Sequence, residues 1–124
     1  MKIPEGHQSV MPYLILPEAE GFSEFAKQVF NAKVSLTRLR EDEKTIMHSE
    51  LMIGNSTIMF AGATEQFTTQ TAHLFVYADN ADETYQKALN NGATSVMGLC
   101  DQDYGRTCGI LDPFGNTWWI TSVH

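Results

Sequence analysis

The order of apolar and polar positions predicts a strand, a helix and three further strands in the first half of the chain. Val10–Leu16 is a short apolar run, and Pro12 within it suits an edge strand because proline cannot donate to a ladder. Residues 21–30 have apolar side chains at helical spacing, with glutamates near the start, where the helix dipole favours them. The strand-like stretches are 34–40, 46–53 and 57–61, the last two joined by Gly54-Asn55, which suits a tight hairpin.

The same order of signals starts again after a polar stretch, residues 64–71, which we interpret as a linker. Residues 73–77 read as a strand, and residues 82–91 as a helix that Asp79-Asn80 would cap and Gly92 would end. Three further strands are predicted at 95–100, 108–111 and 118–123, with a turn at 112–116.

Short motifs recur about 60 residues apart, which indicates a duplicated unit. Gly54-Asn55-Ser56 matches Gly115-Asn116-Thr117, and the helix end at Asn31-Ala32 matches Asn91-Gly92. We therefore predict an α+β fold in which 1–124 is a single domain of two βαβββ repeats, about 9–62 and 71–124. The whole chain is long enough to bury one core, whereas a single repeat would bury only a marginal one.

Composition and charge limit the kinds of partner that the protein is expected to bind. The chain is 43% apolar with a net charge of −7, which is ordinary for a globular protein and offers no basic stripe for nucleic acid. No apolar run approaches the length of a membrane span, and the first residues do not resemble a signal segment, so we expect a cytoplasmic protein. The two cysteines, Cys100 and Cys108, are expected to be free thiols, the latter buried and inert.

The repeats contain two segments, His73–Asn80 and Asp112–Trp119, which together resemble the vicinal-oxygen-chelate superfamily of glyoxalases, bleomycin-resistance proteins and extradiol dioxygenases. Val10–Leu14, Ile46–Asn55 and Gly105–Gly109 make the chain similar to its PhnB-like branch. The resemblance implies that the two units form a cup-shaped mixed sheet, with the helices outside and a cavity within. It also implies pairing of subunits, so we expect a homodimer whose cup is built within one chain or across two.

In metal-using members of that superfamily, four inward side chains bind a divalent ion. The resemblance places these positions at Met11 and His73 in the first strand of each unit. Counting four residues past each hairpin glycine places the others at Ile58 and Trp119. Only His73 is a good donor, because isoleucine and indole donate nothing and a thioether is too soft. The expectation is a degenerate metal site, His73 only, with no cofactor.

His48 and Glu50 offer an alternative metal site. They are two residues apart on one strand and so share a face, where they could join His73 around Ni, Zn, Mn or Fe. The pattern does not decide which face is inward, and a hydrogen-bonded structural pair is the competing interpretation. His7 and His124, near the termini, are expected to be exposed and without a role.

The same alternation predicts an aromatic cup lining. The predicted ligand-binding residues are Met11, Tyr13, His48, Glu50, Ile58, His73, Phe75, Tyr77, Arg106 and Trp119. Such a lining suits a flat or apolar organic molecule, although the same side chains could simply fill a core. Arg106, in a polar loop, could meet a ligand carboxylate or pair with Asp101, Asp103 or Asp112.

Three functions follow from these patterns. The first is a metal-free module that binds a small organic molecule, and the second is a metal-dependent lyase, isomerase or dioxygenase using His73 with His48 and Glu50. The third is a regulatory or interaction protein whose cup has collapsed. The missing donors favour the first and weigh against metal-dependent catalysis, and the chain has no GxSxG motif and no Gly-rich phosphate loop.

Overall fold

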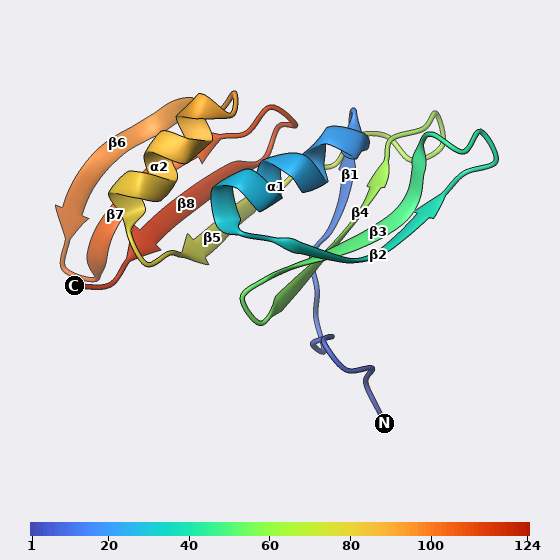
Figure 1. Ribbon diagram of the computed structural model, residues 1–124, viewed down its shortest axis with the longest axis horizontal. Coiled ribbons are helices and arrows are strands. Elements are labelled where there is room, and N and C mark those ends of the chain that lie inside the picture. Colours follow the sequence, from blue (N-terminus) through green and yellow to red (C-terminus); the bar gives the residue numbers. More distant parts are fainter.

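The computed structural model describes residues 1–124, which form two βαβββ units of the same topology (Figure 1). The first unit contains β1 (Tyr13–Leu16), a 3-10 turn η1 (Ala19–Gly21), α1 (Phe22–Phe30), β2 (Lys33–Leu39), β3 (Ile46–Ile53) and β4 (Ser56–Gly62). The second contains β5 (His73–Tyr77), α2 (Ala81–Asn90), β6 (Thr94–Gln102), β7 (Gly105–Leu111) and β8 (Thr117–Ser122). The predicted α+β fold of two βαβββ units is confirmed.

Each unit forms its own four-stranded mixed sheet. The strand orders are β1-β4-β3-β2 and β5-β8-β7-β6, so the two sheets have equivalent connections. The first strand of each unit pairs in parallel with the last, and the other pairs are antiparallel. β1 is an edge strand that begins only after Pro12, as the proline predicts.

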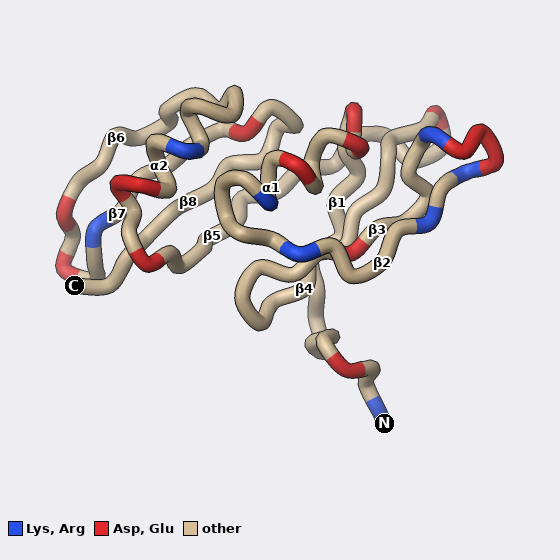
Figure 2. The backbone as a smooth tube through the Cα atoms, in the orientation of Figure 1, with Lys and Arg blue, Asp and Glu red and all other residues tan.

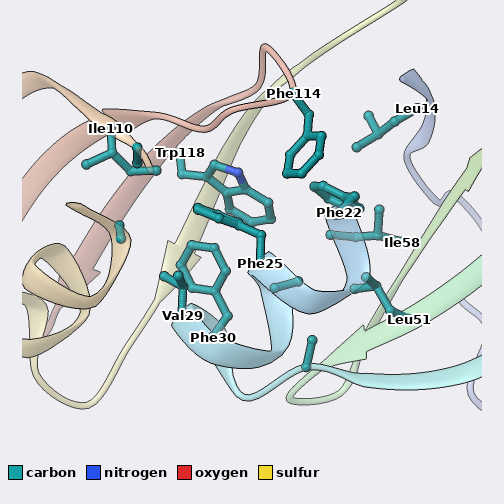
Figure 3. Packing of buried hydrophobic residues seen from close by; sticks show 14 of the residues in the cluster. Leu14, Phe22, Phe25, Val29, Phe30, Leu51, Ile58, Ile110, Phe114 and Trp118 are labelled. Atoms are coloured by element: carbon teal, nitrogen blue, oxygen red, sulfur yellow. The ribbon is translucent and has the colours of Figure 1, made fainter. Parts of the chain in front are cut away.

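The core joins the two units through their helices. Three phenylalanines of α1, Phe22, Phe25 and Phe30, pack against Phe114 and Trp118 of the second unit (Figure 3). The rings of Phe30 and Trp118 have centroids only 4.4 Å apart. The helix-facing sides of both sheets are therefore buried together, and the opposite faces are left open. We call these opposite faces the open faces.

The helix and turn signals have the predicted consequences. The side chain of Asn80 accepts a hydrogen bond from the Glu83 amide at the start of α2, and Gly92 follows the helix with a φ of 96°. One loop prediction is wrong. Most of residues 100–107 belong to a hairpin, because Asp101 pairs with Arg106 and Gln102 pairs with Gly105 in the ladder. Only Asp103 and Tyr104, between the end of β6 and the start of β7, form the turn.

Lys and Arg residues are interleaved with acidic residues along the chain (Figure 2). Neither helix has the length and apolar character needed to cross a membrane.

Candidate functional site

The open face of the first sheet carries a row of polar and aromatic side chains. The register places Tyr13 beside Met59, and Met59 beside Glu50, across three neighbouring strands. Neighbours in register point to the same side of a sheet, so these side chains share the open face, together with His48 two residues before Glu50. The structure thus decides what the sequence could not: His48 and Glu50 face away from the helices.

Four of these side chains are joined by hydrogen bonds. The Nε2 atoms of His7 and His48 lie 2.7 Å and 2.8 Å from the two oxygens of Glu50, and the Tyr13 hydroxyl lies 2.9 Å from His48 Nδ1. Glu50 is only 8% exposed. Hydrogen bonds from His48 and His7 lower the pKa of Glu50 against the opposing effect of burial, so the carboxylate is ionised.

His7 corrects a prediction, because it is half-buried on the open face rather than free near the terminus. The hydroxyl of Thr57 donates to the Gly6 carbonyl, and the Thr57 amide donates to the Gln8 side chain 3.3 Å away. These contacts place the N-terminal segment on β4 and bring His7 to Glu50. No periodicity in the sequence signals a contact between segments this distant.

The open face of the second sheet is aromatic. Phe75 and Tyr77, on β5, pack edge to face with centroids 5.2 Å apart and are 53% and 67% exposed. Trp119, on β8, lies beside Phe75 in register and donates from Nε1 to His73 Nδ1 over 3.2 Å. Its indole lies against Gly109, where an added Cβ would come within 2.5 Å of the ring. A side chain at position 109 would therefore displace the indole.

The Trp119–His73 hydrogen bond bears directly on metal binding. A neutral imidazole has one nitrogen lone pair, and here Nδ1 accepts the indole N–H, so Nε2 carries the proton. Metal binding through either nitrogen would require breaking this bond or changing the tautomer. The chain contains no group of three or more His, Cys, Asp or Glu side chains arranged to hold a metal ion. The residues at the positions where metal-using members of the superfamily bind the ion therefore do not fit a divalent metal.

One of those positions, Ile58, lies on the opposite side of its sheet from the open face, although it lines the hollow between the units. Ile58 is a core residue under the helices, 6% exposed, and Met59 occupies the open face instead. Counting four residues past the glycine gives opposite sides of the sheet in the two units, because the turn before β4 differs from the turn before β8. The first leads to Ser56, which pairs with Ile53 on the helix side, whereas the second leads to Thr117, which pairs with Leu111 on the open side. Met59, whose only donor is a soft thioether, suits a hard divalent ion no better than isoleucine does.

Arg106 lies apart from the open faces. Its guanidinium forms two hydrogen bonds with Asp82 at the start of α2, at 3.0 Å and 3.2 Å, and lies 3.5 Å from Asp101. Of the three aspartates that the sequence offers as partners of Arg106, only Asp101 lies within ion-pair distance. Met11 lies two residues before β1 and is half-buried.

Both cysteines are free, as the sequence predicts. Burial raises the pKa of the Cys108 thiol to about 11, so it is protonated and unreactive at neutral pH.

Two hollows are large enough for a small organic molecule. One, of about 820 Å³, lies on the open face of the first sheet between Tyr13 and Phe67. The other, of about 1070 Å³, lies between the units and reaches Phe75 and Tyr77. Tyr13 lines only the first hollow and Phe75 only the second, although Met52 and Thr57 at the end of the first sheet's open face also reach the second hollow.

Comparison with known proteins defines the family. The Glyoxalase/Bleomycin resistance protein/Dioxygenase superfamily matches residues 14–120. The chain belongs to this superfamily. It is 32% identical to the uncharacterized protein Mb0911c of Mycobacterium bovis, over 89% of this chain and 80% of that protein.

Solved structures share the fold. The PhnB protein from Bacillus cereus has a TM-score of 0.71 and 15% identity, over 94% of this chain and 100% of that one. TnmS3, an antibiotic binding protein from Streptomyces sp. CB03234, has a TM-score of 0.69 and 12% identity, over 95% and 100%. TioX from Micromonospora sp. ML1 has a TM-score of 0.73 and 21% identity, over 94% and 97%. At these identities the likeness concerns the fold alone.

Proposed function

We propose that this protein is a PhnB-like member of the superfamily that binds a small aromatic or apolar organic molecule without a divalent metal. The observation that carries the proposal is the Trp119–His73 hydrogen bond. It occupies the free lone pair of the one good donor among the superfamily's metal-binding positions. The open faces then offer aromatic side chains, and the polar groups of the first sheet's open face are already hydrogen-bonded to one another. This arrangement suits stacking and orientation of a ligand rather than Lewis-acid chemistry.

The exposed aromatic side chains support a ligand over a filled core. Tyr13, Phe75 and Tyr77 are each about half-exposed or more, so they do not form part of the buried cluster. TnmS3, an antibiotic binding protein of the same fold, is a precedent for a binding role. The alternative metalloenzyme would need His73 to join His48 and Glu50, but His73 is on β5 and contacts Trp119, whereas Glu50 bonds to His48 and His7.

We also propose that the binding unit is a homodimer. The two units of one chain are joined through their helices, and the aromatic side chains of their open faces, Tyr13 and Phe75, line different hollows. A second copy could place its second-unit face opposite the first-unit face, so that each cup draws on both chains. Size-exclusion chromatography with light scattering should give twice the 13.9 kDa chain mass, and a monomer at ligand-saturating conditions would contradict this.

The binding proposal is tested by titration with a flat aromatic compound such as acridine, followed by quenching of tryptophan fluorescence. We expect saturable binding that EDTA does not change. Replacing Trp119 with Leu or Phe75 with Leu should weaken it about 3- to 10-fold, since an aromatic contact contributes about 0.5–1.5 kcal/mol. Tyr104→Phe, an exposed change in the β6–β7 turn, is the control. Absence of saturable binding would contradict the proposal.

A further inference from the structure

The hollow on the first sheet is lined by an exposed tyrosine, Tyr13, whose hydrogen bonding depends on its neighbours His48 and Glu50. Tyr13 is 48% exposed and lines the hollow of about 820 Å³, together with Ile15, Met47, Ala61 and Phe67. The charged residues at its edge are Arg40, which donates to the Gly62 carbonyl at 2.9 Å, and Glu65. Thr64 and Gln66, from the segment after β4, complete the polar lining, and Tyr13 is the polar side chain that the strands contribute.

The direction of each hydrogen bond behind Tyr13 follows from Glu50. An ionised carboxylate only accepts hydrogen bonds, so Nε2 of His48 must carry a proton to contact it at 2.8 Å. When the imidazole carries only that proton, its lone pair is on Nδ1, and the Tyr13 hydroxyl donates to it over 2.9 Å. His7 satisfies the other oxygen of Glu50, which keeps the carboxylate in place. With its proton committed to His48, the Tyr13 oxygen can only accept from a molecule in the hollow.

We propose that this hollow selects ligands that carry a hydroxyl donor on an aromatic ring, the phenol class, and that this hydroxyl donates to Tyr13 Oη. The inference rests on the proposed binding function. It adds the chemical class of the ligand and the direction of the hydrogen bond between the ligand and Tyr13. Tyr13 contacts the ligand, whereas His48 and Glu50 are positioning residues. An ether or carbonyl oxygen at the same place would face the tyrosine's lone pairs and gain no hydrogen bond.

A matched pair of compounds isolates the hydroxyl. Isothermal titration at pH 8 compares 2-naphthol with 2-methoxynaphthalene, which has the same rings but no donor. We expect 2-naphthol to bind about fivefold more tightly, as one net hydrogen bond of about 1 kcal/mol provides. Tyr13→Phe should bring the affinity ratio to about one without changing the affinity for the ether. Tyr104→Phe should keep the ratio.

Glu50→Gln tests the positioning role. A glutamine amide can donate to His48 Nε2, which moves the imidazole proton to Nδ1 and frees the Tyr13 hydroxyl to donate into the hollow. The ether should then gain affinity and the ratio should fall toward one. Equal affinities in the wild type, or a ratio that survives Tyr13→Phe, would overturn this inference alone. Failure of both compounds to bind would overturn the proposed function with it.

Discussion

The turn at 112–116 determines where β8 begins, and one carboxylate holds it. Asp112 is 3% exposed and accepts four hydrogen bonds. The donors are the amides of Phe114 and Asn116, the Asn116 side chain at 3.0 Å and the Trp118 indole at 2.8 Å. Since Trp118 packs against α1, loss of this carboxylate disturbs both the turn and the joint between the units.

Asp112→Ala should reduce the free energy of unfolding by about 3–5 kcal/mol. Each buried donor left unpaired costs about 1–3 kcal/mol, and the contributions of touching groups are not fully additive. With a urea m-value of about 1.5 kcal/mol/M, the midpoint should fall by about 2–3 M.

Urea titration followed by tryptophan fluorescence and circular dichroism measures this change. Asp103→Ala, at an exposed position in the β6–β7 turn, is the control and should stay within about 0.5 kcal/mol of the wild type. A loss below about 1 kcal/mol for Asp112→Ala would refute the assignment of Asp112 as the anchor of this turn.

Three further predictions concern other parts of the chain. Gly109→Ala should displace the Trp119 indole, shift the indole N–H resonance in NMR spectra and lower the free energy of unfolding by about 1–3 kcal/mol. Gly98→Ala is the control, because nothing lies within 4 Å of the added Cβ, and it should leave that resonance in place. Because the pKa of Glu50 is lowered in the folded state, the folded chain binds fewer protons than the unfolded chain just below pH 4.5. The free energy of unfolding should therefore fall as the pH is lowered through this range, and it should fall less steeply with pH in Glu50→Gln. Equal slopes in the two proteins would refute the hydrogen-bond network around Glu50. A thiol reagent at pH 8 should modify half-buried Cys100 in the folded protein but Cys108 only in denaturant, and rapid reaction of both would contradict the burial of Cys108.

The fold was predictable because its signals are local and repeated. The period of apolar positions, the cap at Asn80 and Gly92 each depend on a few neighbouring residues, and the duplication repeats the order of strands and helix. The candidate site was only partly predictable. Tyr13, Phe75 and Trp119 lie on the open faces as expected, but Ile58 does not, because strand parity is set by pairing across the turn and not by distance from a glycine. The side on which His48 lies was left open by the sequence.

The missed contacts all depend on tertiary structure. His7 meets Glu50 across 43 residues of sequence, and Arg106 meets Asp82 across 24. Nothing in a periodic pattern distinguishes these partners from other charged residues of the chain, since such pairs form wherever the folded backbone brings them together.

Metal dependence is the most direct test of the central claim, which is that the protein binds an aromatic ligand without a divalent ion. The decisive measurement is the affinity for acridine before and after exhaustive chelation and after reloading with Ni, Zn, Mn or Fe, with the metal content per subunit determined at each step. We predict the same affinity throughout and a metal content far below one ion per subunit. Near-stoichiometric metal that is lost in His73→Ala, with binding abolished by chelation and restored by reloading, would contradict the account.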